Sequence, residues 1–155
     1  MDIPVTDRLL HAHGFATDTA DHLAALTGED VDAQEAAIEH LASAIMNQGA
    51  PWPATGVVAE YVAHLVATKA TAEAIHEALI DFLVEVEEAI EIAEEDGGEA
   101  VQNADLAELG RDLDAELSAI SSDKDLEIQF VDLVLTHAYL GVLAVAPQVR
   151  AALER

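Results

Sequence analysis

Apolar residues recur at spacings of three and four along most of this chain, and that period predicts amphipathic α-helices. In the stretch DVDAQEAAIEHLASAIMNQG, it predicts a helix with Asp32 as its N-cap, Glu35 completing a capping box, and Gly49 as the residue that ends it. The pattern predicts a next helix capped by Thr55 and a longest helix over residues 71–96. These three helices form the best-defined unit.

Weaker patterns predict further helices. They cover about residues 5–13, 17–28, 106–120, 123–140 and 148–155. The helix that starts near residue 123 is apolar around most of its circumference, so we expect it to be central. No strand period of two persists. We therefore predict one all-α domain over residues 1–155 with about seven helices joined by short connections. Two arrangements stay open, an irregular helical bundle and an antiparallel helix stack.

Composition agrees with a helical core. The chain has 155 residues, of which 52% are hydrophobic and only 4% aromatic, so the core must be built from Ala, Leu, Val and Ile. There is no cysteine, which excludes disulfides, thiolate zinc sites and cysteine nucleophiles. The N-terminus lacks the pattern of a secretory signal, and the longest apolar runs are too short to cross a bilayer, so we expect a cytoplasmic protein.

Charge gives the strongest indication about partners. Thirty-one acidic residues oppose six basic ones, for a formal net charge of −25. Nucleic acids and anionic membranes are disfavoured, because both are bound through Lys and Arg. Two explanations of the acidity stay open: halophilic adaptation to a salty cytoplasm, and complementarity to a basic protein partner.

The segment IMNQGAPWPATGVVAEYV, residues 45–62, interrupts the simple composition. Gly49 permits a left-handed residue, each proline pushes its predecessor into extended backbone, and Thr55 can start a helix. The segment therefore predicts a rigid corner between two helices. Trp52 either covers the corner as an apolar plug or, with Tyr61, anchors a partner, since aromatic residues are frequent in binding hot spots.

This corner also resembles the opening repeat of HEAT-like (armadillo-type) helical proteins of the actinobacterial type. The positions that carry the resemblance are His40, Leu41, Ile45, Gln48, Gly49, Pro53, Ala54, Thr55, Val62 and Leu65. Residues 78–89 are also similar to the helix that follows in such proteins. The resemblance covers about a third of the chain, and the regular repeat corners of the family are not found beyond residue 95. It implies a protein-binding scaffold.

Candidate chemistry is sparse. Glu73 and His76 have the Glu-x-x-His spacing of carboxylate metal sites, and Glu60 and His64, four residues apart, could join them if the two helices are antiparallel. The pair formed by His11 and His13 could bind a metal only in extended backbone, and the predicted helix separates the two side chains. No phosphate-binding loop or nucleophile motif occurs, so the sequence predicts neither an enzyme nor a cofactor.

An acidic run on the longest helix points instead to a surface for a partner. The candidate contacts there are Glu85, Glu88, Glu91 and Glu95. Like charges at this spacing destabilise a helix by roughly 0.2–0.5 kcal/mol per pair, so their presence needs a compensating reason. We expect a non-catalytic protein-binding scaffold, in its sharpest form an acidic inhibitor or immunity-type protein for a basic effector. The alternatives are a salt-adapted helical protein and a metal-binding protein that uses Glu60, His64, Glu73 and His76.

Overall fold

The computed structural model describes residues 1–96 and 124–154, and within them the predicted helical class is confirmed. The helices are α1 (Thr19–Ala25), α2 (Val31–His40), the π-helix η1 (Leu41–Ile45), α3 (Thr55–Thr68), α4 (Glu73–Asp96), α7 (Lys124–Ala144) and α8 (Ala146–Leu153). The predicted helix over 106–120 lies outside the described residues. No helix in the described part of the chain is long and apolar enough to cross a membrane.

The prediction of a helix over residues 5–13 is wrong. The segment instead forms a small antiparallel hairpin of β1 (Leu10–His11) and β2 (Gly14–Phe15). Gly14 has a φ of +122°, which a residue with a side chain rarely adopts. A helix of nine residues is marginal by itself, and here the Thr6 hydroxyl donates a hydrogen bond to the Ala16 carbonyl across the hairpin, which favours the extended form.

The second hairpin explains the corner at residues 45–62. Helix α2 continues into η1, and the chain then turns through β3 (Met46–Asn47) and β4 (Ala50–Pro51). Gln48 and Gly49 have φ values of 53° and 79°, so both residues of the turn are left-handed, as in a type I′ turn. A corner between two helices is confirmed, but Gly49 belongs to a hairpin and does not end the helix directly.

Two predicted caps are shifted by one or two residues. The N-cap of α2 is Asp30, whose carboxylate accepts the backbone N–H groups of Asp32 and Ala33. Ala54 is the N-cap of α3, and Thr55 is its first helical residue. The Thr55 hydroxyl is buried, donates to the Ile45 carbonyl and accepts the Trp52 N–H at 2.8 Å. It therefore holds the two sides of the corner together.

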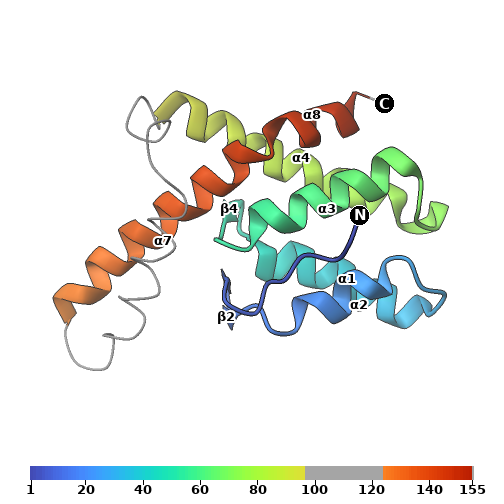
Figure 1. The fold of residues 1–155 in the computed structure, drawn as a ribbon, viewed down its shortest axis with the longest axis horizontal. Helices are drawn as coiled ribbons and strands as arrows, with labels where there is room; N and C mark the ends of the chain where they lie inside the picture. Colours follow the sequence, from blue (N-terminus) through green and yellow to red (C-terminus); the bar gives the residue numbers. More distant parts are fainter. Residues whose placement is uncertain (97–123, 155) are drawn as a thin grey trace.

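Helix α3 occupies the centre of the described structure, since it packs on α4, α7 and α8. The predicted apolar stripe of α4 is buried as expected. It consists of Ile75, Leu79, Phe82, Leu83, Val86, Ile90 and Ala93. Helix α7 packs on α3 and α4 with its C-terminal half, whereas its N-terminal half extends beyond the other described helices (Figure 1). The central position expected for that helix thus belongs to α3.

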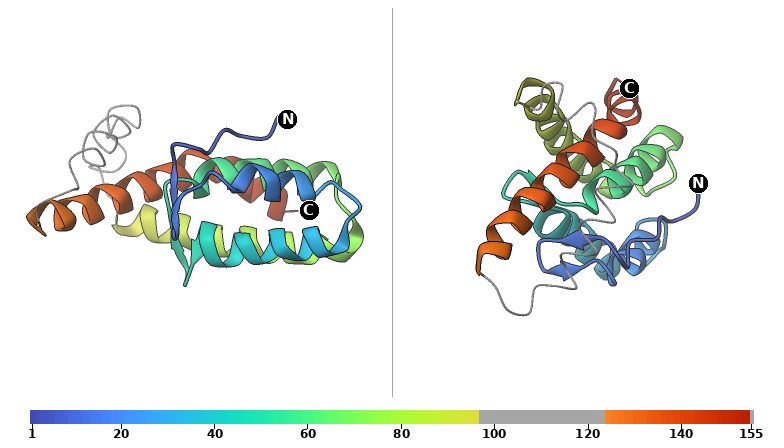
Figure 2. Two further views of the ribbon diagram at one scale, coloured as in Figure 1. Left: turned by 90° about the horizontal axis from the view of Figure 1, so that it is seen from below. Right: turned by 60° about the vertical axis from the view of Figure 1, so that its left-hand side comes forward.

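The helices pair in sequence order. Helices α1 and α2 run antiparallel, and so do α3 and α4 (Figure 1). Seen from below, α1 and α3 lie on one side and α2 and α4 on the other (Figure 2). The two hairpins lie together at one end of these helices, where β1 and β2 meet η1 and the start of α3. This end brings together side chains from separate parts of the chain.

Candidate functional site

The two aromatic residues predicted to anchor a partner are not equally available. Tyr61 is only 5% exposed and belongs to the core cluster around α3, so it cannot serve as an anchor on the surface. Trp52 is half-buried at the corner, which agrees better with an apolar plug than with a protruding contact. The prediction failed for Tyr61 because α3 is covered on more sides than its sequence pattern indicated.

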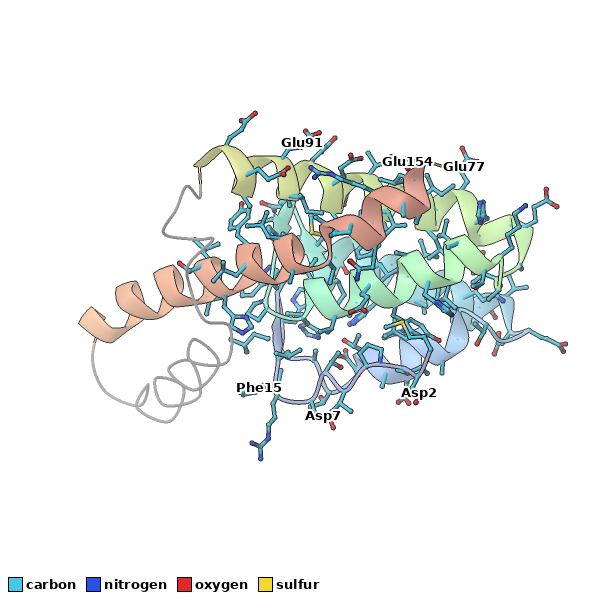
Figure 3. The ribbon with its side chains drawn as sticks, turned by 45° about the horizontal axis from the view of Figure 1, so that its top comes forward. Asp2, Asp7, Phe15, Glu77, Glu91 and Glu154 are labelled. Carbon is cyan, nitrogen blue, oxygen red and sulfur yellow. The ribbon has the colours of Figure 1, made fainter. Side chains whose placement is uncertain are left out.

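The predicted acidic contacts on α4 do lie on the surface. Glu85, Glu88, Glu91 and Glu95 are all exposed, and Glu91 points away from the helix bundle (Figure 3). Two apolar side chains of the same helix are also exposed, Val84 at 40% and Ile92 at 44%. The outer face of α4 is therefore acidic with apolar interruptions.

One flank of α4 is already occupied by a basic residue. Arg150 of α8 forms an ion pair and hydrogen bonds with the Glu94 carboxylate and lies 3.9 Å from a Glu87 carboxylate oxygen. The hydrogen bond between them lowers the pKa of Glu94 and raises that of Arg150. This flank is closed by a contact within the chain, so a partner would need to use the other one.

The opposite flank of α4 borders a hollow of about 170 Å³. Its walls come from α2, η1 and α4 and consist of Ile38, Leu41, Ala42, Ala78 and Phe82, with Asp81 and Glu85 among the lining residues. These two carboxylates are four residues apart and share a face of the helix. Neither has an ion-pair partner among the side chains that the structure describes, those of residues 1–95 and 134–154. The hollow thus combines apolar walls with two uncompensated negative charges.

The structure does not gather the four residues of the predicted metal site. Glu60 and His64 line a different hollow, beside Gln148 and Ala151 of α8, and neither Glu73 nor His76 borders it. Within the described part of the chain, the group of carboxylates and imidazoles whose ligand atoms converge is His11, Asp18 and His40. The spacing within one helix was correct, but the packing of α3 on α4 does not bring the two pairs together.

His11 is fixed by the backbone on either side of it. The Leu10 carbonyl accepts the Ala54 N–H at 3.0 Å, and the Ala12 N–H donates to the Ala44 carbonyl of η1 at 2.9 Å. These bonds hold β1 between η1 and the start of α3, and leave the His11 side chain only 3% exposed. Its position is therefore determined by three elements at once.

Asp18 approaches His11 from the start of α1. Asp18 occupies the N-cap position, yet its carboxylate makes no capping bond. Instead, Asp18 Oδ1 lies 2.9 Å from His11 Nε2. The His13 backbone N–H donates to His11 Nδ1 at 3.1 Å, so a neutral His11 carries its proton on Nε2 and donates it to the carboxylate. The Asp18 side chain is 57% exposed, which opens this pair to solvent.

His40 enters from the end of α2, where the helix passes into η1. Its Nε2 lies 2.8 Å from the Thr19 hydroxyl, and its Nδ1 lies 4.0 Å from Asp18 Oδ2. His22 stacks on the His40 ring at a centroid distance of 4.3 Å, and the His11 ring meets the same ring edge-on at 5.2 Å. The π-helical turn η1 begins at the residue after His40, and π-helical turns within helices are frequent at functional sites.

The electrostatics of the cluster keep Asp18 charged and His40 neutral. Burial, together with the neighbouring His22, lowers the pKa of His40 to about 4, although Asp18 acts in the opposite direction. Partial burial would raise the pKa of Asp18, but hydrogen bonding, first of all from His11, outweighs it, so that pKa is lowered. At neutral pH the cluster therefore offers a carboxylate beside an unprotonated imidazole.

Sequence reasoning missed Asp18 and His40 as members of a site. Only the spacing of His11 and His13 gave a signal, and it was set aside because a helix was expected there. The backbone at His11 is in fact extended, as part of β1, but it places His11 against Asp18 and leaves His13 exposed. Nothing in the local pattern links residue 40 to residue 11, because the link runs through tertiary packing.

Comparison with protein-family models, with curated proteins and with solved structures gave no match.

Proposed function

We propose that this protein is a non-catalytic scaffold that binds a basic protein partner, and that the hollow beside α4 receives an arginine side chain of that partner. The observation that carries this proposal is the combination of apolar walls with the unpaired carboxylates of Asp81 and Glu85. An arginine matches it, because its aliphatic stem can pack on apolar surface while its guanidinium binds carboxylates.

The size of the hollow favours a single side chain over a small molecule. Sites for drug-sized ligands typically span about 300–1,000 Å³, whereas this hollow has about 170 Å³. The remaining acidic face of α4 then serves as the surrounding contact. A net charge of −25 would accelerate the encounter with a basic partner, by roughly 10- to 1,000-fold at low salt. These properties suit an acidic inhibitor or immunity-type protein for a basic effector.

The scaffold itself supports the same proposal. Two consecutive helical hairpins, α1 with α2 and α3 with α4, are what a HEAT-like arrangement requires, and we propose that relationship for residues 19–96. Such arrangements present helix faces as extended binding surfaces. Here the face of α4 between Arg150 and the hollow is the surface offered.

A capped pentapeptide with a central arginine tests the hollow directly. We expect its titration into methyl-labelled protein to shift the NMR signals of Ile38 and Leu41, which line the hollow, in a saturable way. The same peptide with norleucine at the centre has the aliphatic stem without the charge and should leave them unchanged. Because each charged hydrogen bond contributes a few kcal/mol at most, Asp81→Asn with Glu85→Gln should weaken binding roughly tenfold.

The matched control removes the same charge elsewhere. Glu35→Gln with Glu39→Gln changes two exposed carboxylates of α2, also four residues apart, that do not line the hollow. If this pair weakened binding as much as the substitutions at the hollow, arginine would be attracted to the general negative field, and the proposed contact would be wrong.

Salt adaptation remains the second candidate explanation of the acidity. In the described ion pairs, Arg150 is the only basic residue other than histidine that meets a carboxylate, so most of the acidic surface is uncompensated. Thermal melts across a salt series separate the two explanations. A protein that unfolds readily at low salt and binds no arginine peptide would be salt-adapted, whereas saturable binding at salt concentrations that screen the general field supports the partner.

A further inference from the structure

We propose that His11, Asp18 and His40 form a site for one divalent transition-metal ion of the Zn²⁺ type. Their ligand atoms all lie within 4.8 Å of one another, and two of the three side chains are buried. Ligands of a tetrahedral zinc ion lie about 2.0–2.1 Å from the metal, and therefore roughly 3.4 Å from each other. Small side-chain rotations would bring the ligand atoms from their present separations to those required around the ion.

The donor set decides which class of ion fits. Two imidazoles and one carboxylate suit zinc, iron, cobalt and nickel, whereas magnesium and calcium prefer oxygen ligands alone. The site is thus chemically distinct from the general acidic surface, which would attract any cation. The exposed carboxylate of Asp18 leaves the site open to solvent, so water can complete the coordination.

His40 already has the support that a metal-binding histidine needs. With its Nε2–H donated to the Thr19 hydroxyl at 2.8 Å, the lone pair of Nδ1 faces Asp18, whose Oδ2 lies 4.0 Å away. A hydrogen bond of this kind fixes the tautomer and the ring orientation of metal-bound histidine, and its loss typically weakens metal affinity 10- to 100-fold. Thr19 is therefore assigned as a positioning residue for His40.

His11 must change its tautomer when the metal binds. At present its Nδ1 accepts the His13 N–H, and its Nε2–H donates to Asp18. Metal binding at Nε2 moves the proton to Nδ1 of the neutral ring, with water carrying it and no net release. The Nδ1–H of His11 and the backbone N–H of His13 would then point at each other, so the hydrogen bond between these two residues must break. Metal binding at this site is thus tied to a local change in the turn between β1 and β2.

The remaining histidines have other positions around the site. His22 is stacked face to face on His40, and His13 meets His11 edge-on at 5.9 Å. Neither belongs to the converging group. They serve as internal controls, because a metal held merely by a histidine-rich surface would also involve them.

The test uses the full chain, stripped of metal with a chelator and titrated with Zn²⁺ in a background of Mg²⁺ that occupies oxygen-only sites. We expect one equivalent to bind by calorimetry. In histidine ¹⁵N spectra, the signals of His11 Nε2 and His40 Nδ1 should shift, together with the backbone amide of His13. Saturating Zn²⁺ that leaves these nitrogens unchanged would overturn the proposal without any variant being needed.

Matched substitutions give a second, independent readout. Asp18→Asn should weaken Zn²⁺ binding at least tenfold, whereas Asp21→Asn, an equal loss of charge on an exposed position of α1, should leave it within about twofold. His22→Gln should also have little effect. Thr19→Val should weaken binding, and Thr19→Ser, which keeps the hydroxyl, should restore it. Equal effects of the two aspartate substitutions would mean that the ion is held by the acidic surface in general.

Discussion

A close approach between α3 and α7 gives the most quantitative prediction. Gly56, in the first turn of α3, faces Gly141 of α7. A Cβ atom at residue 56 would lie 2.5 Å from the Gly141 carbonyl oxygen and 2.7 Å from its carbon. A Cβ at residue 141 would lie 3.9 Å from the Gly56 Cα, which is an ordinary van der Waals distance. The same substitution should therefore have opposite effects at the two positions.

The magnitude follows from what must move. To raise the distance at residue 56 from 2.5 Å to an ordinary 3.4 Å, the backbones of α3 and α7 must separate by about 0.9 Å, because neither group is a flexible side chain. Overpacking of this kind typically costs about 1–3 kcal/mol. Alanine gains up to about 1 kcal/mol over glycine in a helix interior, and this gain applies to Gly141 within α7 but not to Gly56 in the first turn of α3. We expect Gly56→Ala to destabilise by about 1–3 kcal/mol and Gly141→Ala to be neutral or to stabilise by up to about 1 kcal/mol.

Urea unfolding followed by far-UV circular dichroism measures this difference. At constant pH and salt, the unfolding midpoint of Gly56→Ala should fall while the slope stays that of the wild type. For a chain of this length, each kcal/mol corresponds to about 2–4 °C in Tm. Equal destabilisation by the two substitutions would refute the reasoning, because it would show that α3 and α7 do not approach each other asymmetrically at this point.

Two further predictions concern buried polar groups. Thr55→Ala should cost about 1–3 kcal/mol, because it leaves the Ile45 carbonyl and the Trp52 N–H without their partner, whereas Thr55→Ser should cost less than about 1 kcal/mol; similar losses in urea unfolding would contradict this role. In metal-free protein, the folded state holds His40 with a pKa of about 4, whereas the unfolded chain titrates near its ordinary 6.5, so the unfolded state binds more protons between these values. That contribution, at most about 3 kcal/mol, is complete above pH 6.5 and is lost as the pH falls towards 4. His40→Gln should therefore flatten the fall of stability over this window, and parallel stability curves for variant and wild type would exclude His40 as a main cause.

Local patterns predicted local structure well. The apolar spacing of three and four identified the helix over residues 71–96 and its buried stripe, because a helix that packs on one side must place its apolar residues there. Gly49 indicated a left-handed residue, since glycine adopts positive φ without steric cost. The errors at residues 5–13 and at the cap of α3 arose where short-range preferences were weak and a hydrogen bond to a distant residue decided the outcome, whereas the α2 cap moved to Asp30 through local bonds.

The candidate sites show the same distinction between what local pattern predicts and what packing decides. The acidic outer face of α4 was predictable, because exposure of charged residues follows from the helical period alone. The hollow beside Asp81 and Glu85 was not, because its walls come from α2 and η1, whose distance from α4 depends on packing. The burial of Tyr61 was likewise decided by how many neighbours surround α3.

The chain by itself determined that helices form, where most of them lie, and that their exterior carries a large negative charge, because these properties depend on residues a few positions apart. The convergence of His11, Asp18 and His40 was decided only by the tertiary structure. The three residues belong to a strand, a helix start and a helix end, and the directions of their side chains are fixed by hydrogen bonds between distant backbone segments. Such a site depends on the relative positions of whole elements, which no local pattern of residues encodes.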